Sequence, residues 1–203
     1  MNRVMIAFAA TLTIAGALPA LAAFSLNVPL VAAIPTAPTS SFPAGATAKL
    51  DWNLTEGHTA EEPATAALVS DGKYLYVRFD VTQTAPLIGL DGGDNVAVDL
   101  WPDGESGEHY RFGVGLSGAH TADSTTNTAG WESTESTHPG GYQVTMKIPM
   151  TAVASPNTAR VQFSRWIAST GELQVWAHST AESDVAQAGT LTIGGSVSAT
   201  TDR

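Results

Sequence analysis

The chain of 203 residues contains no cysteine. This absence excludes disulfide bonds, thiolate metal sites, cysteine nucleophiles and c-type haem attachment. Basic residues are also few: nine Lys and Arg stand against 19 Asp and Glu, which gives a formal net charge of −10. Such a charge disfavours nucleic acid and anionic membrane surfaces as partners, because both are negatively charged themselves. Neutral ligands and cations remain compatible with this composition.

No apolar run is long enough for a comfortable membrane span, which needs about 20 residues. The run at 4–18 follows Arg3, and Ala20-Leu21-Ala22 fits the small-x-small rule for signal cleavage. We therefore expect residues 1–22 to be a signal peptide. The same segment predicts export to the periplasm or the extracellular space, with no membrane span in the mature chain.

The remaining chain is predicted to form a single domain with short flanking segments. Residues 23–45 are rich in Pro, Ala and Thr, and their four prolines disfavour a helix. We expect a linker-like lead-in or an edge strand there, one domain over 46–193, and a flexible tail over 194–203.

Short segments that alternate apolar and polar residues recur through the domain, separated by Gly, Asp, Asn, Ser and Pro. Period-two alternation is typical of half-buried strands. The expected strands are 47–52, 64–70, 73–81, 94–101, 108–117, 141–148, 159–168, 172–179 and 189–193, and only 149–154 suggests a helical turn. This pattern predicts an all-β, single-domain β-sandwich with immunoglobulin-sized sheets; a closed barrel is the alternative.

Alternation also predicts which side chains face the core. These are Leu75, Val77, Phe79, Val81, Val96, Val98, Leu100, Tyr110, Phe112, Val114, Leu116, Tyr142, Val144, Met146, Ile148, Val161, Phe163, Leu173 and Val175. Three tryptophans fall on the opposite faces of their strands: Trp101, Trp166 and Trp176. We expect these three indoles to be turned toward water.

Several segments together carry a family resemblance. They are LDW at 50–52, DGKYLYV at 71–77, the strand from Asp94 to Asp99, YRFGVGLSG at 110–118, Trp131, Gly141-Tyr142, Ile148-Pro149 and FSRW at 163–166. In this order and spacing they resemble the family 9 carbohydrate-binding modules and the related DOMON-like domains. The resemblance implies a jelly-roll-like sandwich that binds sugar chains or their ends, often beside structural calcium.

The sequence departs from the family pattern where sugar-binding members contact their ligand. The stretch LDGGDNVAVD at 90–99 has no tryptophan before the strand, and Ala97 stands near the expected glutamate. Arg111 is close to the position of the expected arginine. The resemblance therefore supports the fold more strongly than the binding site.

An aromatic platform is the first candidate site. An indole can stack on the apolar C–H face of a sugar ring, and nearby polar groups can hydrogen-bond the hydroxyls. The predicted ligand-binding residues are Trp101, Trp166, Trp176, Arg165, Gln174, His178 and Asp99. The alternative is that loops cover these indoles, or that Trp166 and Trp176 only pair across adjacent strands.

A calcium site is the second candidate, in the acidic loop that contains Asp91, Asp94 and Asn95. Calcium prefers six to eight hard oxygen ligands, and such a loop can supply several. A second acidic loop holds Asp103, Glu105 and Glu108. The alternative is ordinary turn chemistry, because Asp, Asn and Gly dominate tight turns without any metal.

Redox and hydrolytic chemistry have little support. Met146 or Met150 could ligate haem together with a histidine, as in some DOMON-like relatives, but Met146 falls in a core row. No motif pairs two carboxylates for glycoside hydrolysis. We therefore expect a non-catalytic domain that binds a glycan, as an accessory in carbohydrate catabolism. The alternatives are an envelope domain with a structural or interaction role whose sugar site is lost, and a haem-binding redox domain.

Overall fold

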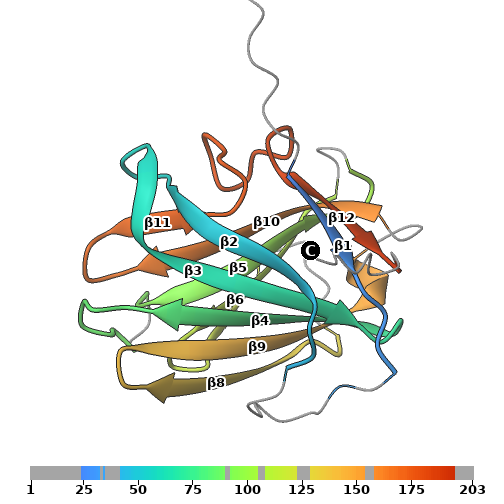
Figure 1. Ribbon diagram of the computed structural model, residues 1–203, viewed down its shortest axis with the longest axis horizontal. Coiled ribbons are helices and arrows are strands. Elements are labelled where there is room, and N and C mark those ends of the chain that lie inside the picture. Colours follow the sequence, from blue (N-terminus) through green and yellow to red (C-terminus); the bar gives the residue numbers. More distant parts are fainter. Residues whose placement is uncertain are drawn as a thin grey trace, which may run out of the picture.

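The computed structural model describes residues 24–32, 34, 42–89, 92–104, 108–122, 129–153 and 158–194. The predicted signal peptide and the predicted tail beyond Gly194 lie outside these ranges. Within them the chain is almost entirely strand (Figure 1). The elements are β1 (Ser25–Val28), β2 (Ala46–Asn53), β3 (His58–Ser70), β4 (Tyr74–Thr82), β5 (Asn95–Trp101), β6 (Tyr110–Gly115), β7 (His120–Thr121), β8 (Glu132–His138), β9 (Gly141–Pro149), the 3-10 turn η1 (Met150–Ala152), β10 (Thr158–Ile167), β11 (Glu172–Val175) and β12 (Gly189–Ile193). No helix in this described part is long and apolar enough to cross a membrane.

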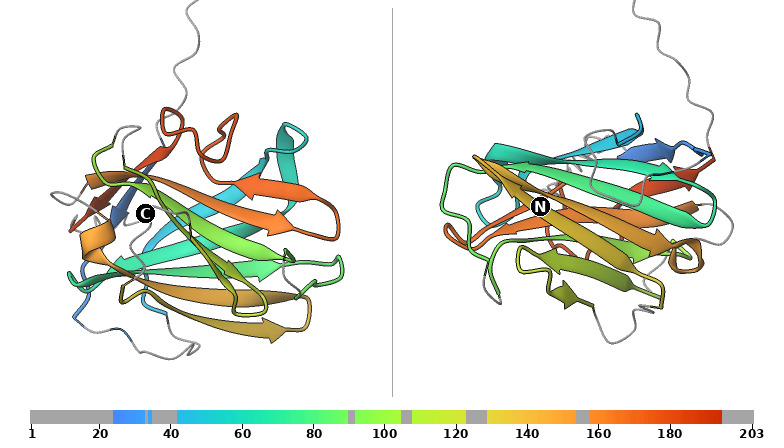
Figure 2. Two further views of the ribbon diagram at one scale, coloured as in Figure 1. Left: turned by 180° about the vertical axis from the view of Figure 1, so that it is seen from behind. Right: turned by 90° about the horizontal axis from the view of Figure 1, so that it is seen from below.

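The strands form one curled sheet with the order β7-β6-β5-β10-β11-β2-β3-β4-β9-β8. The curl produces two packed layers: a front layer of β2, β3, β4, β9 and β8, and a back layer of β11, β10, β5, β6 and β7 (Figure 2). β2 connects them, because it pairs with β3 along most of its length and with β11 at its end. An irregularity between Leu50 and Trp52 accompanies this change of partner. The predicted all-β sandwich is confirmed.

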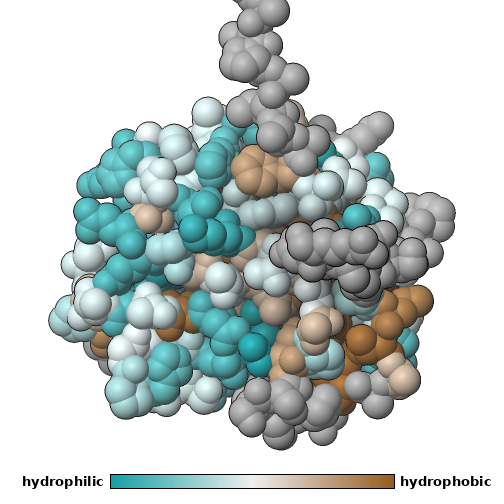
Figure 3. All heavy atoms as spheres, in the orientation of Figure 1, coloured by the Kyte–Doolittle hydropathy of each residue, from teal (hydrophilic) through white to brown (hydrophobic). Residues whose placement is uncertain are grey.

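The core lies between the two layers, and the rows that alternation predicts for β4, β5, β6 and β9 supply much of it, together with residues of β2, β3 and β10. Phe79 of the front layer meets Phe163 of the back layer edge to face, with ring centroids 6.2 Å apart. The outer face of the front layer is largely hydrophilic on its left side, and hydrophobic side chains gather toward its right edge (Figure 3). Sequence alternation was therefore a sound guide to the inner faces of these four strands.

The predicted inner face is wrong for β11, where Leu173 and Val175 were expected to face the core. The register pairs Arg165 with Gln174, and residues opposite each other in an antiparallel ladder share a face. Arg165 has the parity of Phe163, so it points inward and Gln174 follows it. Leu173 and Val175 consequently lie on the outer face, beside Trp166 and Ser164.

Three strands lie outside the nine strand ranges expected from the sequence: β1, β7 and β8. β8 has the sequence ESTESTH, which contains no apolar residue, and it pairs only with β9 at the edge of the sheet. β1 falls in the predicted lead-in and pairs in parallel with β12, which matches the edge-strand expectation for that segment. Leu26 and Val28 of β1 are buried in the core.

The two ends of the sheet approach each other through side chains. His120 of β7 stacks on Trp131, with ring centroids 4.2 Å apart, and its Nε2 lies 2.7 Å from the hydroxyl of Ser133 in β8. Trp131 also contacts Phe112 edge to face. These side-chain contacts connect β7 with the start of β8, and no backbone ladder joins the two strands in the part of the chain that the structure describes.

Candidate functional site

The outer face of the back layer brings several predicted site residues together, and it is the face turned to the viewer on the left of Figure 2. The register places Asn95 of β5 opposite Trp166 of β10, and Ala97 opposite Ser164. On the other side, Asp99 lies opposite Arg111 of β6. Together with Glu182 from the β11–β12 connection, these residues are called the outer-face site: Asn95, Asp99, Arg111, Ser164, Trp166 and Glu182.

A charge cluster forms one end of the outer-face site. Arg111 Nη1 donates to both oxygens of Asp99, at 3.1 and 2.9 Å, and Nη2 donates to Glu182 Oε1 at 2.6 Å. His109 Nε2 lies 2.9 Å from Asp99 Oδ1. The hydroxyl of Ser164 also donates to Glu182. The cluster fixes the guanidinium between two carboxylates on the sheet surface.

Burial governs the electrostatics of this cluster. Asp99 is fully buried, and burial raises its pKa against the opposing effects of the His109 hydrogen bond and the Arg111 charge. Burial alone would lower the pKa of Arg111, but the carboxylates of Asp99 and Glu182 outweigh it and raise that pKa. The guanidinium therefore stays charged. The side chains of Arg111 and Glu182 keep 27% and 24% of their surface exposed, so both can be reached from solvent.

A small hollow forms the other end of the site. It has a volume of about 60 Å³ and lies where β5 begins and β6 ends, lined by Asn95, Gly115, Ser117 and Thr121 among others. Gly115 lies opposite Asn95 and has no side chain to fill this space. On the opposite side of Asn95 lies Trp166, which is half-buried. The indole of Trp166, the carboxamide of Asn95 and the hollow beside Gly115 thus lie next to one another.

Two of the three predicted platform indoles are not exposed. Trp101 is on the outer face as predicted, but it is only 3% exposed, because His109 stacks on it with ring centroids 4.8 Å apart. Trp176 is 6% exposed and packs in the core against Phe24 and Phe163. The prediction that both face water is wrong. For Trp101, alternation predicted the correct side of the strand but not what covers it, whereas Trp176 lies on the inner face and not on the predicted outer face.

Arg165 and Gln174 lie in the interior of the sandwich, where they have no exposed surface. Arg165 donates to Gln174 Oε1, Gln83 Oε1 and the carbonyl oxygens of Glu62 and Thr82. This location is wrong for side chains predicted to meet a ligand from the sheet surface. Both residues brace one end of the core instead.

His178 is exposed, as its predicted role requires, but it lies away from the outer-face site. It stacks on Trp52 with ring centroids 4.8 Å apart, and its Nε2 is 3.1 Å from Asp51 Oδ1. Of the predicted ligand-binding residues, the fold therefore brings only Asp99, Trp101 and Trp166 to one face. Asn95 joins them there from the predicted calcium loop.

The predicted calcium loop is only partly described, since Asp91 lies outside the described residues. Asp94 is fully buried; its Oδ2 accepts from Gln83 Nε2 and the Ile88 N–H, and its Oδ1 accepts from the Ala168 N–H. Asn95 Nδ2 donates to the carbonyl of Gly93. Asp94 thus ties two loops together with both oxygens engaged. In the described part of the chain, no three His, Asp or Glu side chains form a group that could hold a metal ion.

Sequence reasoning missed His109, Ser164 and Glu182 as members of this cluster. Glu182 lies in a connection without a regular hydrophobic pattern, so only the folded position of that segment reveals its contact with Arg111. Ser164 could have been found, because it has the same parity as Trp166. The two methionines named as possible haem ligands have structural contacts. Met146 is buried in the core, and the sulfur of Met150 accepts a hydrogen bond from Ser70.

Comparison with solved structures defines the class of fold. A family 9 carbohydrate-binding module (CBM9) from Caldicellulosiruptor kristjanssonii in complex with glucose superposes with a TM-score of 0.68 and 14% identity, over 85% of this chain and 97% of the module. A CBM9 structure from the same organism in complex with cellotriose gives 0.55 and 16%, over 71% and 82%. A provisionally assigned carbohydrate-binding protein from Bacteroides uniformis gives 0.60 and 16%, over 85% and 100%.

This chain therefore has a CBM9-like fold, which confirms that part of the resemblance seen in the sequence. The DOMON-like part stays a prediction. No protein-family model matches the sequence, and comparison with curated proteins finds no significantly similar chain.

Proposed function

We propose that this protein is an exported, non-catalytic domain that binds a glycan at the outer-face site. The observation that carries the proposal is the half-buried Trp166 ring beside Asn95 and an open hollow, on the same face as the solvent-reachable Arg111 and Glu182. The CBM9-like fold supports it, since two structures with that fold hold glucose and cellotriose.

Stacking and hydrogen bonding would share the binding energy. The indole of Trp166 offers an apolar face to the C–H groups of a pyranose ring. Asn95 and the charged groups of Arg111 and Glu182 offer hydrogen bonds to hydroxyls. A shallow site of this kind gives affinities on the order of micromolar to millimolar.

Titration of the purified chain with glucose and cellotriose, followed by calorimetry or NMR, tests the proposal. Trp166→Ala should weaken binding about tenfold or more, which corresponds to a loss of about 1.4 kcal/mol. Trp52→Ala is the matched control, because that half-buried indole is already stacked by His178. A wild-type chain that binds neither sugar, or a Trp166→Ala variant that binds as well as the wild type, contradicts the proposal.

A structural or interaction role in the cell envelope is the second candidate, and the burial of Trp101 and Trp176 favours it. Phe24, from the segment predicted to precede the domain, covers Trp176. A glycan array without any bound ligand would select this alternative. Export is a separate part of the proposal, and the mature protein should begin at Ala23 when its N-terminus is sequenced.

A further inference from the structure

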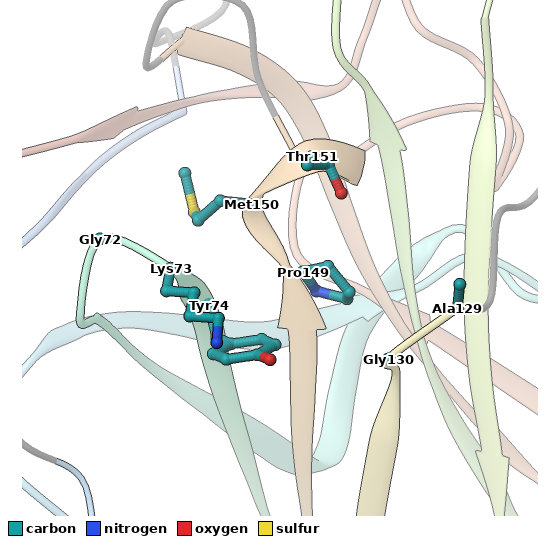
Figure 4. Close-up of a pocket in the computed structure, with 8 residues that line it drawn as sticks. All are labelled: Gly72, Lys73, Tyr74, Ala129, Gly130, Pro149, Met150 and Thr151. Atoms are coloured by element: carbon teal, nitrogen blue, oxygen red, sulfur yellow. The ribbon is translucent and has the colours of Figure 1, made fainter.

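A second pocket lies in the front layer, between the turn before β4 and the 3-10 turn η1 (Figure 4). Its volume is about 330 Å³, and its walls include Lys73, Tyr74, Gly130, Pro149, Met150 and Thr151. This volume lies at the lower end of the range for small-molecule sites, about 300–1,000 Å³. Since Tyr74 belongs to β4 and the outer-face site belongs to β5, β6 and β10, the two sites lie on different layers.

Two of the lysines lie near Tyr74, which forms one wall of this pocket. The chain has only three lysines, Lys49, Lys73 and Lys147. The Nζ atoms of Lys73 and Lys147 lie 5.2 and 4.4 Å from the ring centroid of Tyr74. In a chain with a net charge of −10, two of the three ammonium groups thus lie near one ring; Lys73 lines the pocket itself, and Lys147 lies outside its lining.

The nearby carboxylates leave the charge of Lys73 available. Asp71 is occupied, because its Oδ1 accepts the N–H groups of Lys73 and Tyr74 and its Oδ2 accepts the hydroxyl of Tyr76. Glu132 pairs with Lys147 at 3.0 Å, but its side chain is 66% exposed, and exposed pairs of this kind contribute little. Lys73 has no carboxylate within ion-pair distance among the described residues.

The walls of the pocket suit the ring of a sugar better than a bare anion. Tyr74 and Pro149 present rings, and Met150 adds a flexible apolar side chain. Thr151 contributes a hydroxyl that can both donate and accept. At Gly130, where φ is +78°, an added Cβ would lie 3.6 Å from Pro149 Cγ, so glycine keeps this wall open.

We propose that this pocket binds a sugar residue carrying a carboxylate, such as a uronate. The pyranose ring lies against Pro149, and the carboxylate lies at the ammonium group of Lys73, with Lys147 adding positive charge from beside the Tyr74 ring. The choice of a sugar rests on the proposed function, whereas the negative charge of the ligand follows from the lysines. The site adds a second, chemically different contact to a glycan-binding domain.

NMR titration of the isotope-labelled chain with glucuronate, glucose and sulfate at low ionic strength tests this proposal. Glucuronate should shift the amide signals of Lys73, Tyr74, Gly130 and Thr151, and glucose should not. Lys73→Gln and Lys147→Gln should each weaken glucuronate binding at least threefold. Lys49→Gln is the matched control, since Lys49 aligns through Thr65 with Asp80, six residues and about 20 Å along β4 from Tyr74.

Three results would overturn the uronate site. These are no shifts with glucuronate, sulfate binding as tightly as glucuronate, and an equal loss in the Lys49→Gln variant. Trp166→Ala separates the two proposals, because it should weaken cellotriose binding about tenfold or more and leave glucuronate binding unchanged. Glucuronate binding in a chain that binds no cellotriose would support this pocket while refuting the outer-face site.

Discussion

Replacing Arg165 with methionine should strongly destabilise the fold. The guanidinium is fully buried between the layers, and within the described ranges no carboxylate forms an ion pair with it. It donates to Glu62 O at 2.8 Å, Gln174 Oε1 at 3.1 Å, Gln83 Oε1 at 2.8 Å and Thr82 O at 3.4 Å. These bonds connect β10 and β11 with the ends of the front strands.

The magnitude follows from the acceptors that methionine leaves behind. Glu62 O keeps a donor, because Gln174 Nε2 lies 3.0 Å from it, and Thr82 O loses only a long contact. The carboxamide oxygens of Gln83 and Gln174 lose their guanidinium donors while remaining buried. Each such acceptor costs about 1–3 kcal/mol, so we expect a loss of about 4 kcal/mol. Domains of this kind have about 5–15 kcal/mol in total.

Removal of a buried charge acts in the opposite direction, because the folded protein no longer has to desolvate a cation. The avoided cost of desolvation exceeds the cost of the lost hydrogen bonds only when the acceptors are replaced by apolar groups as well. The Arg165→Met variant leaves these acceptors in place. Removing one member of a buried charged network typically costs about 3–5 kcal/mol. The destabilising effect should therefore dominate.

Urea unfolding followed by tryptophan fluorescence measures the effect. With a denaturant slope of about 2 kcal/mol per molar urea, the midpoint should fall by about 2 M. Arg78→Met is the control, since Arg78 forms a partly exposed pair with Asp80, and its loss should cost no more than about 1 kcal/mol. If the Arg165→Met midpoint stays within about 0.5 M of the wild type, the reasoning about buried acceptors is wrong.

Burial raises the pKa of both Tyr76 and Tyr142 to about 12, whereas phenols in the unfolded chain ionise near pH 10. The contribution of these two phenols to the free energy of unfolding should therefore be fully present below pH 10 and be lost between pH 10 and 12, by up to about 2.7 kcal/mol for each phenol. Urea unfolding of the Tyr142→Phe variant should show about half of this alkaline loss. An unchanged loss would contradict the assignment. Gly189→Ala should cost about 1–3 kcal/mol through overpacking, because its Cβ would lie 2.2 Å from Trp176 Cζ3. Thermal unfolding measures this, with Gly89→Ala as the control because its nearest contact is 4.0 Å away; equal melting temperatures for the two variants would refute the packing argument.

Much of the fold could be predicted because four strands follow strict alternation. In β4, β5, β6 and β9 the apolar rows are long enough to specify both the strand and its inner face. β8 was missed because an edge strand with one solvated face and a polar inner face carries no apolar period. β11 was assigned the wrong face because its four residues are too few to fix a register, which the hairpin with β10 decides instead.

The site was harder to predict because exposure depends on segments distant in the sequence. Trp101 was placed on the correct face, yet the ring of His109 covers it. Arg165 was predicted to bind the ligand, although its parity with Phe163 already indicated the interior. The contact between Arg111 and Glu182 joins positions 71 residues apart, so no periodic pattern in the sequence reveals it.

The parallel pairing of β1 with β12 has a consequence for how the chain reaches its native state. Ser25 aligns with Thr190, and Val28 with Ile193. Of the described strands, β1 emerges first during synthesis and β12 last, so β1 cannot pair until its partner has been made. Contacts of such high sequence separation slow folding, and they make completion of the sheet depend on nearly the entire polypeptide being available at once.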